Sequence, residues 1–225
     1  MKDQETLDFI ANSDEELIKD YLKELMNKLQ LINSKNDKLS LLLILTTVTY
    51  FLIKNSLIAN ISIGPIELSK FDIGIIVLPP IFALMLLYYA VLNVHRAEVI
   101  RTSKVISYAL LKQEKKNIDD EFYASAIVRQ FLPFSFWEEI MKMNYHQNKV
   151  GCISSILSLP LLGIGILPFW FEIYSIKILI IEYWNAGFFV KINVFVSIWI
   201  VLYTIFYYIK LIIIQIEINK NSAIN

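Results

Sequence analysis

The chain has 225 residues, of which 56% are hydrophobic, and its mean hydropathy of +0.53 lies well above that of a soluble domain. Its 21 basic and 21 acidic side chains cancel, so the sequence lacks the positive field that attracts nucleic acid. The single cysteine, Cys152, excludes an intrachain disulfide. The acidic start MKDQETLDFIANSDEE lacks the basic residues and early apolar stretch of a secretory signal.

The N-terminal segment, residues 1–38, predicts an amphipathic helix. Ser13 followed by Glu16 has the spacing of a capping box. Apolar residues then recur at alternating intervals of four and three, which is typical of a short coiled-coil seam: Ile18, Leu22, Leu25, Leu29 and Ile32. The seam either packs on its own chain or joins two copies of the protein, and two heptads leave both interpretations open.

The first apolar run, Leu39–Ile53, reaches the length of a membrane span when it continues through Lys54 to Ile61. Lys54 lies close enough to the outer boundary to extend its ammonium group toward water. The following segment, residues 61–68, reads ISIGPIEL. Its Gly-Pro turn signal between apolar residues predicts a small hairpin outside the membrane.

The second apolar run begins at Ile73 and has 22 residues without a charge. At 1.5 Å per residue, a helix of this length covers about 33 Å, close to the hydrocarbon thickness of a bilayer. Pro79 and Pro80 lie near its start. Inside a bundle, neighbouring helices can bond the carbonyls that prolines leave free, so we expect a kink and not a break.

The central segment, residues 95–149, is too long for a simple connector. We expect helices over 97–116, 119–131 and 136–145, the last opened by a second capping box at Ser135 and Glu138. The piece FLPFSFW, residues 131–137, holds four aromatic rings. It reads as an anchor at the lipid headgroups or as a docking surface for a partner.

Two further apolar runs follow, Gly151–Phe171 and Phe188–Ile209. The first has small residues four apart in two pairs, Gly151 with Ser155 and Ser154 with Ser158, a pattern that allows helices to approach closely. Residues 172–187 separate the two runs and contain three charges. We expect them to form an interfacial helix or an outer cap, because a fifth span would place the C-terminus outside.

These runs predict an all-α integral membrane protein, a four-transmembrane-helix bundle with a cytoplasmic N-terminal helix and a helical central cytoplasmic loop. The segments are an N-terminal helix (1–38), spans one and two (39–94), a cytoplasmic loop (95–149), spans three and four (150–214) and a tail (215–225). The side that holds both termini carries 17 of the 21 Lys and Arg residues. The positive-inside rule therefore places both termini in the cytoplasm.

The sequence offers little chemistry. A metal site needs three or four converging ligands, and His95, Glu98 and His146 are the only candidates that could meet at the inner boundary. We expect a polar interfacial role for them instead. No phosphate-binding, dinucleotide-binding or hydrolase motif occurs. We therefore expect no catalytic, cofactor-binding or metal-binding residues, and no cofactor. Lys54 is the only candidate charge deep enough for an ion path, and we expect no acidic residue inside the spans.

We interpret the chain as a non-enzymatic, self-associating inner-membrane protein that presents cytoplasmic helices to a partner. The composition, rich in Lys, Ile and Asn, is typical of an AT-rich bacterium, which suggests a bacterial accessory or effector subunit. We expect the bilayer, further copies of the chain and a cytoplasmic protein as partners, but not nucleic acid. The alternative is an oligomeric pore or channel, since a pore gated by apolar side chains needs no charges.

Overall fold

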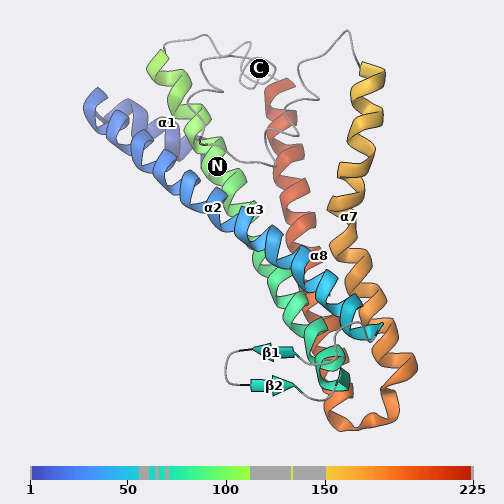
Figure 1. Ribbon diagram of the computed structural model, residues 1–225. Coiled ribbons are helices and arrows are strands. Elements are labelled where there is room, and N and C mark those ends of the chain that lie inside the picture. Colours follow the sequence, from blue (N-terminus) through green and yellow to red (C-terminus); the bar gives the residue numbers. More distant parts are fainter. Residues whose placement is uncertain are drawn as a thin grey trace. The chain divides into compact units, whose positions relative to one another are not determined.

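The computed structural model describes residues 2–55, 61–63, 66–68, 71–111, 133 and 151–223. These residues are helical except for one small hairpin and short turns (Figure 1). The elements are α1 (Lys2–Asn12), α2 (Glu15–Lys54), β1 (Ile61–Ile63), β2 (Ile66–Leu68), α3 (Phe71–Leu111), α7 (Gly151–Glu182), the 3-10 turn η2 (Trp184–Ala186) and α8 (Phe188–Ala223).

The chain divides into two compact units. Unit 1 comprises residues 1–37, 92–157 and 210–225, and unit 2 comprises residues 38–91 and 158–209. Three helices of the described chain are long and apolar enough to cross a membrane: α2, α3 over Gly74–Ser107, and α8 over Phe188–Lys210. The protein is therefore a membrane protein with a helical fold.

Helix α2 joins two elements that the sequence presents separately. The N-terminal amphipathic segment and the first apolar run form one uninterrupted helix of 40 residues. Its N-terminal cap is Asp14, whose Oδ1 accepts a hydrogen bond from the backbone N–H of Leu17 at 3.0 Å, and not Ser13 as expected. The helix ends at Lys54, seven residues before the expected Ile61. The segment 1–38, predicted as one helix, is divided, because a separate helix α1 precedes α2. The ring of Phe9 in α1 packs on that of Tyr21, with ring centres 5.1 Å apart.

The predicted hairpin is present between α2 and α3. Strands β1 and β2 pair antiparallel, with Ile61 opposite Leu68 and Ile63 opposite Ile66. Helix α3 then continues without interruption through Pro79 and Pro80 to Leu111. The sequence predicts that the helix of the second apolar run continues over residues 97–116, and this continuation is confirmed as far as Leu111. The other two helices expected in the central segment lie outside the described residues.

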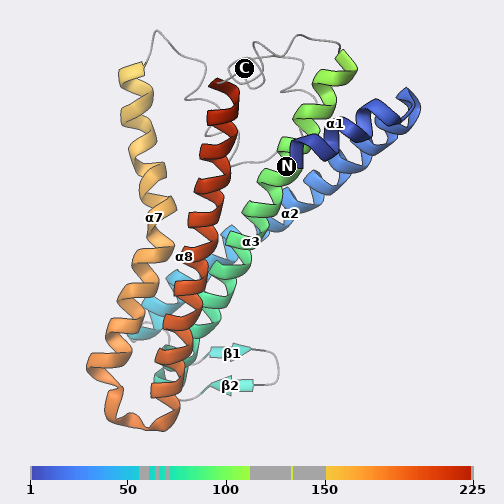
Figure 2. The same cartoon turned by 180° about the vertical axis from the view of Figure 1, so that it is seen from behind.

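Helices α7 and α8 form a hairpin in which they run side by side within unit 2 (Figures 1 and 2). Residues 172–182 continue α7 by three turns and do not form a separate interfacial segment, because no glycine or proline interrupts the helix there. The reversal is confined to Tyr183–Gly187. Gly187 adopts φ 140° and ψ 177°, a conformation open essentially to glycine alone.

In unit 1, the predicted seam of α2 is buried within the single chain. The exposed fractions of Ile18, Leu22, Leu25, Leu29 and Ile32 are 8% or less. Helix α3 contributes its own buried positions to unit 1 at Val99, Ser103 and Ile106. Of the two interpretations of the seam, the structure therefore favours packing on its own chain.

Candidate functional site

Unit 2 buries several polar side chains and exposes large apolar ones. The residues that its helices bury include seven with polar side chains: Ser40, Thr47, Glu172, Ser175, Asn193, Ser197 and Thr204. The exposed positions of α8 carry large apolar side chains, among them Phe188, Phe195, Trp199 and Leu202. Lipid-embedded helices show this arrangement, because small and polar residues mediate their contacts while apolar residues face the acyl chains.

Three of the buried hydroxyl groups, those of Thr47, Ser175 and Thr204, are satisfied within their own helices. The hydroxyl of Thr47 donates to the carbonyl of Leu43, and that of Thr204 donates to the carbonyl of Ile200, both at 2.9 Å. The hydroxyl of Ser175 donates to the backbone carbonyl of Glu172 at 2.9 Å. These bonds remove the cost of placing hydroxyl groups in an apolar interior, and they leave little chemistry available at these three residues.

Asn193 has a more specific role. Pro80 has no N–H, so the carbonyl of Ile76 in α3 loses the hydrogen bond that residue 80 would otherwise donate. The side-chain amide of Asn193 in α8 donates to that carbonyl at 3.3 Å. A neighbouring helix thus bonds the carbonyl that the proline leaves free, as expected from the two prolines in the sequence.

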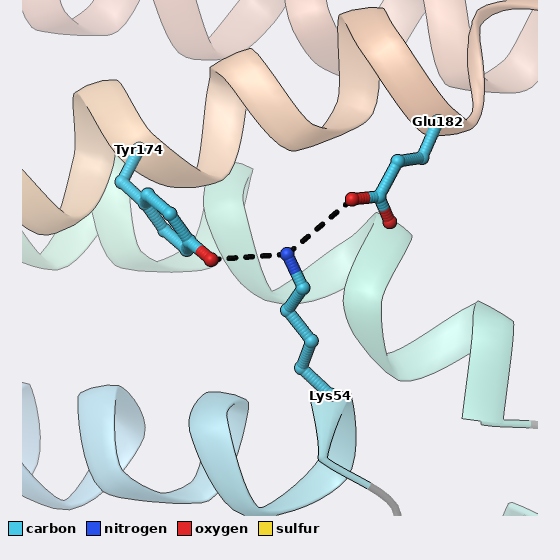
Figure 3. A network of polar contacts seen from close by, with 3 residues as sticks. All are labelled: Lys54, Tyr174 and Glu182. Carbon is cyan, nitrogen blue, oxygen red and sulfur yellow. Dashed lines mark hydrogen bonds and ion pairs between the residues drawn. The ribbon is translucent and has the colours of Figure 1, made fainter.

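A polar cluster lies where α2 and α7 end, and Figure 3 shows its three residues. The ammonium nitrogen of Lys54 lies 3.0 Å from the hydroxyl of Tyr174 and 3.5 Å from Oε1 of Glu182. The same nitrogen lies 5.0 Å from the centre of the Tyr174 ring, a cation–π distance. Lys54 therefore pairs with residues of α7 instead of only extending into water, and the cluster joins the two helix ends.

Glu172 is the main departure from the sequence interpretation. It was expected in the outer segment, but it lies inside α7 with none of its surface exposed. Neither carboxylate oxygen has a hydrogen-bond partner among the described residues. The ring of its neighbour Phe171 packs on those of Tyr50 and Phe82, with distances of 5.1 Å and 4.5 Å between ring centres, so the surroundings are aromatic. The expectation that Glu172 belongs to a separate outer segment is therefore wrong, because it is a buried acidic residue of α7.

Unit 1 contains a second polar cluster, built on the amides of α2. Nε of Arg96 donates to Oδ1 of Asn33 at 2.8 Å, and the amide of Asn36 donates to Oδ1 of Asn93 at 3.1 Å. The amide of Asn33 also donates to the carbonyl of Pro133 at 3.4 Å. These bonds fix the register of α2 against α3 in unit 1, and they tie one described residue of the central segment to α2.

The residues considered for metal binding do not converge in the described chain. Nδ1 of His95 lies 3.9 Å from Oε2 of Glu98, while His146 lies outside the described residues. Within the described part of the chain, no three His, Cys, Asp or Glu residues form a group that could hold a metal ion. Residues 134–150 lie outside the described residues, as do the side chains of Cys152 and of Ser155 and Ser158 in the predicted small-residue pattern.

Comparison with known proteins adds no relative. No family model matches the chain, and neither a curated protein nor a solved structure matches it.

Proposed function

We propose that the protein crosses the inner membrane four times. In this proposal α7 is a span in addition to α2, α3 and α8, and it is the third of the four along the chain. The uncharged stretch Gly151–Phe171 and the five-residue reversal into α8 support this count. The clustering of 17 of the 21 Lys and Arg residues in the segments that hold the termini and the central loop supports a cytoplasmic location for those segments.

We propose that the protein is a non-enzymatic, self-associating subunit that presents its cytoplasmic helices to a protein partner. The observation that carries this proposal is unit 1, which gathers residues 1–37 and 92–157 into one compact body. Buried amides at Asn33 and Asn36 hold its helices in register, while charged residues of α2 remain exposed. A rigid helical body with a charged exterior suits recognition of a soluble protein.

Self-association would use a surface other than the seam of α2, because that seam is already covered within one chain. Helix α8 offers large exposed apolar side chains that can pack against a second copy in lipid. Crosslinking in native membranes tests this part of the proposal. We expect crosslinked dimers or larger species for the wild type. If only the monomer is found after crosslinking, self-association is contradicted.

Reporter fusions test the topology. Fusions at Asn33, Gln113 and Asn221 are expected to report the cytoplasm, and fusions at Ser69 and Asn185 the outside. A cytoplasmic result at Asn185 contradicts the four-span arrangement. Affinity purification from membranes then tests the partner: we expect a soluble protein that is retained by the wild type and lost when Asn33 and Asn36 are both replaced by Leu. The same protein retained by that variant would contradict docking on unit 1.

A pore is the second candidate function, and the buried polar side chains of unit 2 favour it. Buried Ser, Thr, Asn and Glu side chains on several helices are typical of ion and proton paths in membranes. Conductance of the purified protein in a planar bilayer separates the two candidates. Reproducible channels would support the pore and contradict a purely docking role, whereas a silent bilayer would favour the docking subunit.

A further inference from the structure

Glu172 lies deep on the inward face of α7. Positions 172, 175, 179 and 182 share one helix face, and the first three are fully buried, whereas Glu182 at the end of the helix is exposed. Ten residues separate Glu172 from Glu182, which corresponds to about 15 Å along the helix axis. Glu172 therefore lies about three turns deeper along α7 than Glu182.

Among the described residues, the neighbouring helices supply no counter-charge that is free for Glu172. Helix α2 contributes Tyr50, whose buried hydroxyl also lacks a partner among these residues, and Lys54, whose ammonium group is bonded to Tyr174 and Glu182. Helix α7 adds Tyr174, Tyr183 and Glu182, and α3 adds Tyr89, which packs partly buried against the same apolar cluster. The residues that α3 and α8 bury beside them are uncharged: Ile75, Phe82, Leu86, Val190, Asn193 and Val194.

A charged carboxylate in these surroundings would lose its hydration and gain neither a hydrogen bond nor a cation. Burial of an unpaired ion costs several kcal/mol, whereas a neutral carboxylic acid avoids most of that cost. A carboxyl group buried in a membrane protein without a partner is a functional site by default, since such residues are costly and mark ion or proton routes.

We propose that Glu172 is a proton-binding site in the interior of unit 2 and that its carboxyl group carries a proton at neutral pH. Release of the proton requires a partner for the carboxylate, which either water or the ammonium group of Lys54 would supply after separating from Glu182. The site stands independently of the proposed docking function, because it uses only residues of unit 2.

Dicyclohexylcarbodiimide tests the site on the wild-type protein in membranes. This apolar reagent takes the proton of a carboxylic acid, its central carbon bonds to the carboxylate oxygen, and the adduct rearranges to a stable N-acylurea without loss of atoms. Peptide mass spectrometry then compares Glu172 with Glu182. We expect at least roughly tenfold more label on Glu172 at neutral pH, and a loss of that label as the pH rises and the acid ionises.

Two controls separate protonation from access. A water-soluble carbodiimide should reverse the preference and label Glu182, since Glu172 is not exposed. In Lys54→Met, label on Glu172 should persist, because Lys54 does not neutralise it in the wild type. If Glu172 is labelled only after Lys54→Met, the two residues form an ion pair in the wild type, and the proposal is wrong.

A competing occupant is also tested. Replacing choline by sodium at constant pH and ionic strength should leave the label on Glu172 unchanged. Protection by sodium would identify a metal cation as the occupant and overturn the assignment of a proton. Equal, pH-independent labelling of Glu172 and Glu182 would likewise overturn it. None of these outcomes depends on whether the docking function or the pore is correct.

Discussion

The two halves of helix α2 bury the same face, but the residues on their exposed face differ in polarity. Buried positions recur along the whole helix at intervals of three and four, from Ile18 through Leu29 and Leu43 to Tyr50. Before Lys38 the exposed face is largely charged, with Glu15 paired to Lys19 at 2.6 Å. After Lys38 the exposed face is apolar and includes Leu41, Leu42, Ile44, Leu45 and Val48.

The buried face keeps its mixed character along the helix. It combines Leu and Ile with Asn33 and Asn36 in unit 1, and apolar residues with Ser40 and Thr47 in unit 2. A soluble helix exposes polar residues, while a helix in lipid exposes apolar ones. The change of the exposed face near Lys38 is therefore the mark of a passage from water to lipid along a single helix, and the periodicity of the buried positions does not reveal it.

The strongest test of this comparison concerns the interior of unit 1. Leu29 is 1% exposed, whereas Leu31, two residues away, is 64% exposed. Leu29→Ala should lower the free energy of unfolding by about 2–5 kcal/mol, and Leu31→Ala should change it by no more than about 0.5 kcal/mol. Unfolding in detergent, followed by circular dichroism, measures both variants.

Protein concentration sharpens that measurement. If Leu29 packs within its own chain, the loss of stability is the same at every protein concentration. If it packs against a second copy, the loss depends on concentration by mass action. A concentration-dependent loss would restore the seam as a subunit interface and would contradict the packing described here.

A matched pair of charged substitutions tests the surfaces. Leu202 in α8 and Leu31 in α2 are similarly exposed, at 60% and 64%. Leu202→Asp should disfavour membrane insertion of α8 by roughly 3 kcal/mol, because Leu favours and Asp strongly disfavours a position near the centre of a span. Leu31→Asp should leave insertion unchanged. Glycosylation-site mapping of the inserted fraction measures both, and equal effects would show that the two surfaces meet the same solvent.

A substitution in the reversal between α7 and α8 should have a smaller effect on the stability of unit 2. Gly187→Ala should destabilise the hairpin by about 1–3 kcal/mol, since φ 140° with ψ 177° strains any residue with a Cβ. The added Cβ would have no atom within 4 Å, so the cost comes from the backbone alone. Asn185→Ala in the adjoining 3-10 turn is the control. Thermal unfolding that is identical for the two variants would contradict the backbone explanation.

The smallest expected effect concerns the bond from Asn193 to the carbonyl of Ile76. Asn193→Val leaves that carbonyl without its partner. In the Pro80→Ala background, the N–H of residue 80 replaces it. The double-mutant cycle should therefore give a coupling of about 0.6–1.7 kcal/mol, with Asn193→Val more costly when Pro80 is present. Strictly additive unfolding free energies would show that the bond contributes nothing.

The sequence predicted the apolar helices, the hairpin at 61–68 and the continuation of α3, because each depends on local composition and turn residues. It did not predict the burial of Glu172. A charge after an apolar run resembles the end of a span, and only the rings of Tyr50 and Phe82, distant in sequence, show that the residue is enclosed. The pairing of Asn36 with Asn93 has the same origin, since 57 residues separate them.

The bond between Asn193 and Ile76 also links the assembly of unit 2 to the order of synthesis. The ribosome adds Ile76 to the chain 117 residues before it adds Asn193. During that interval α3 has a carbonyl that neither its own helix nor lipid can bond. The second helix of the bundle is thus incomplete until the last one arrives, so α3 is expected to remain beside water or the insertion machinery until α8 joins it.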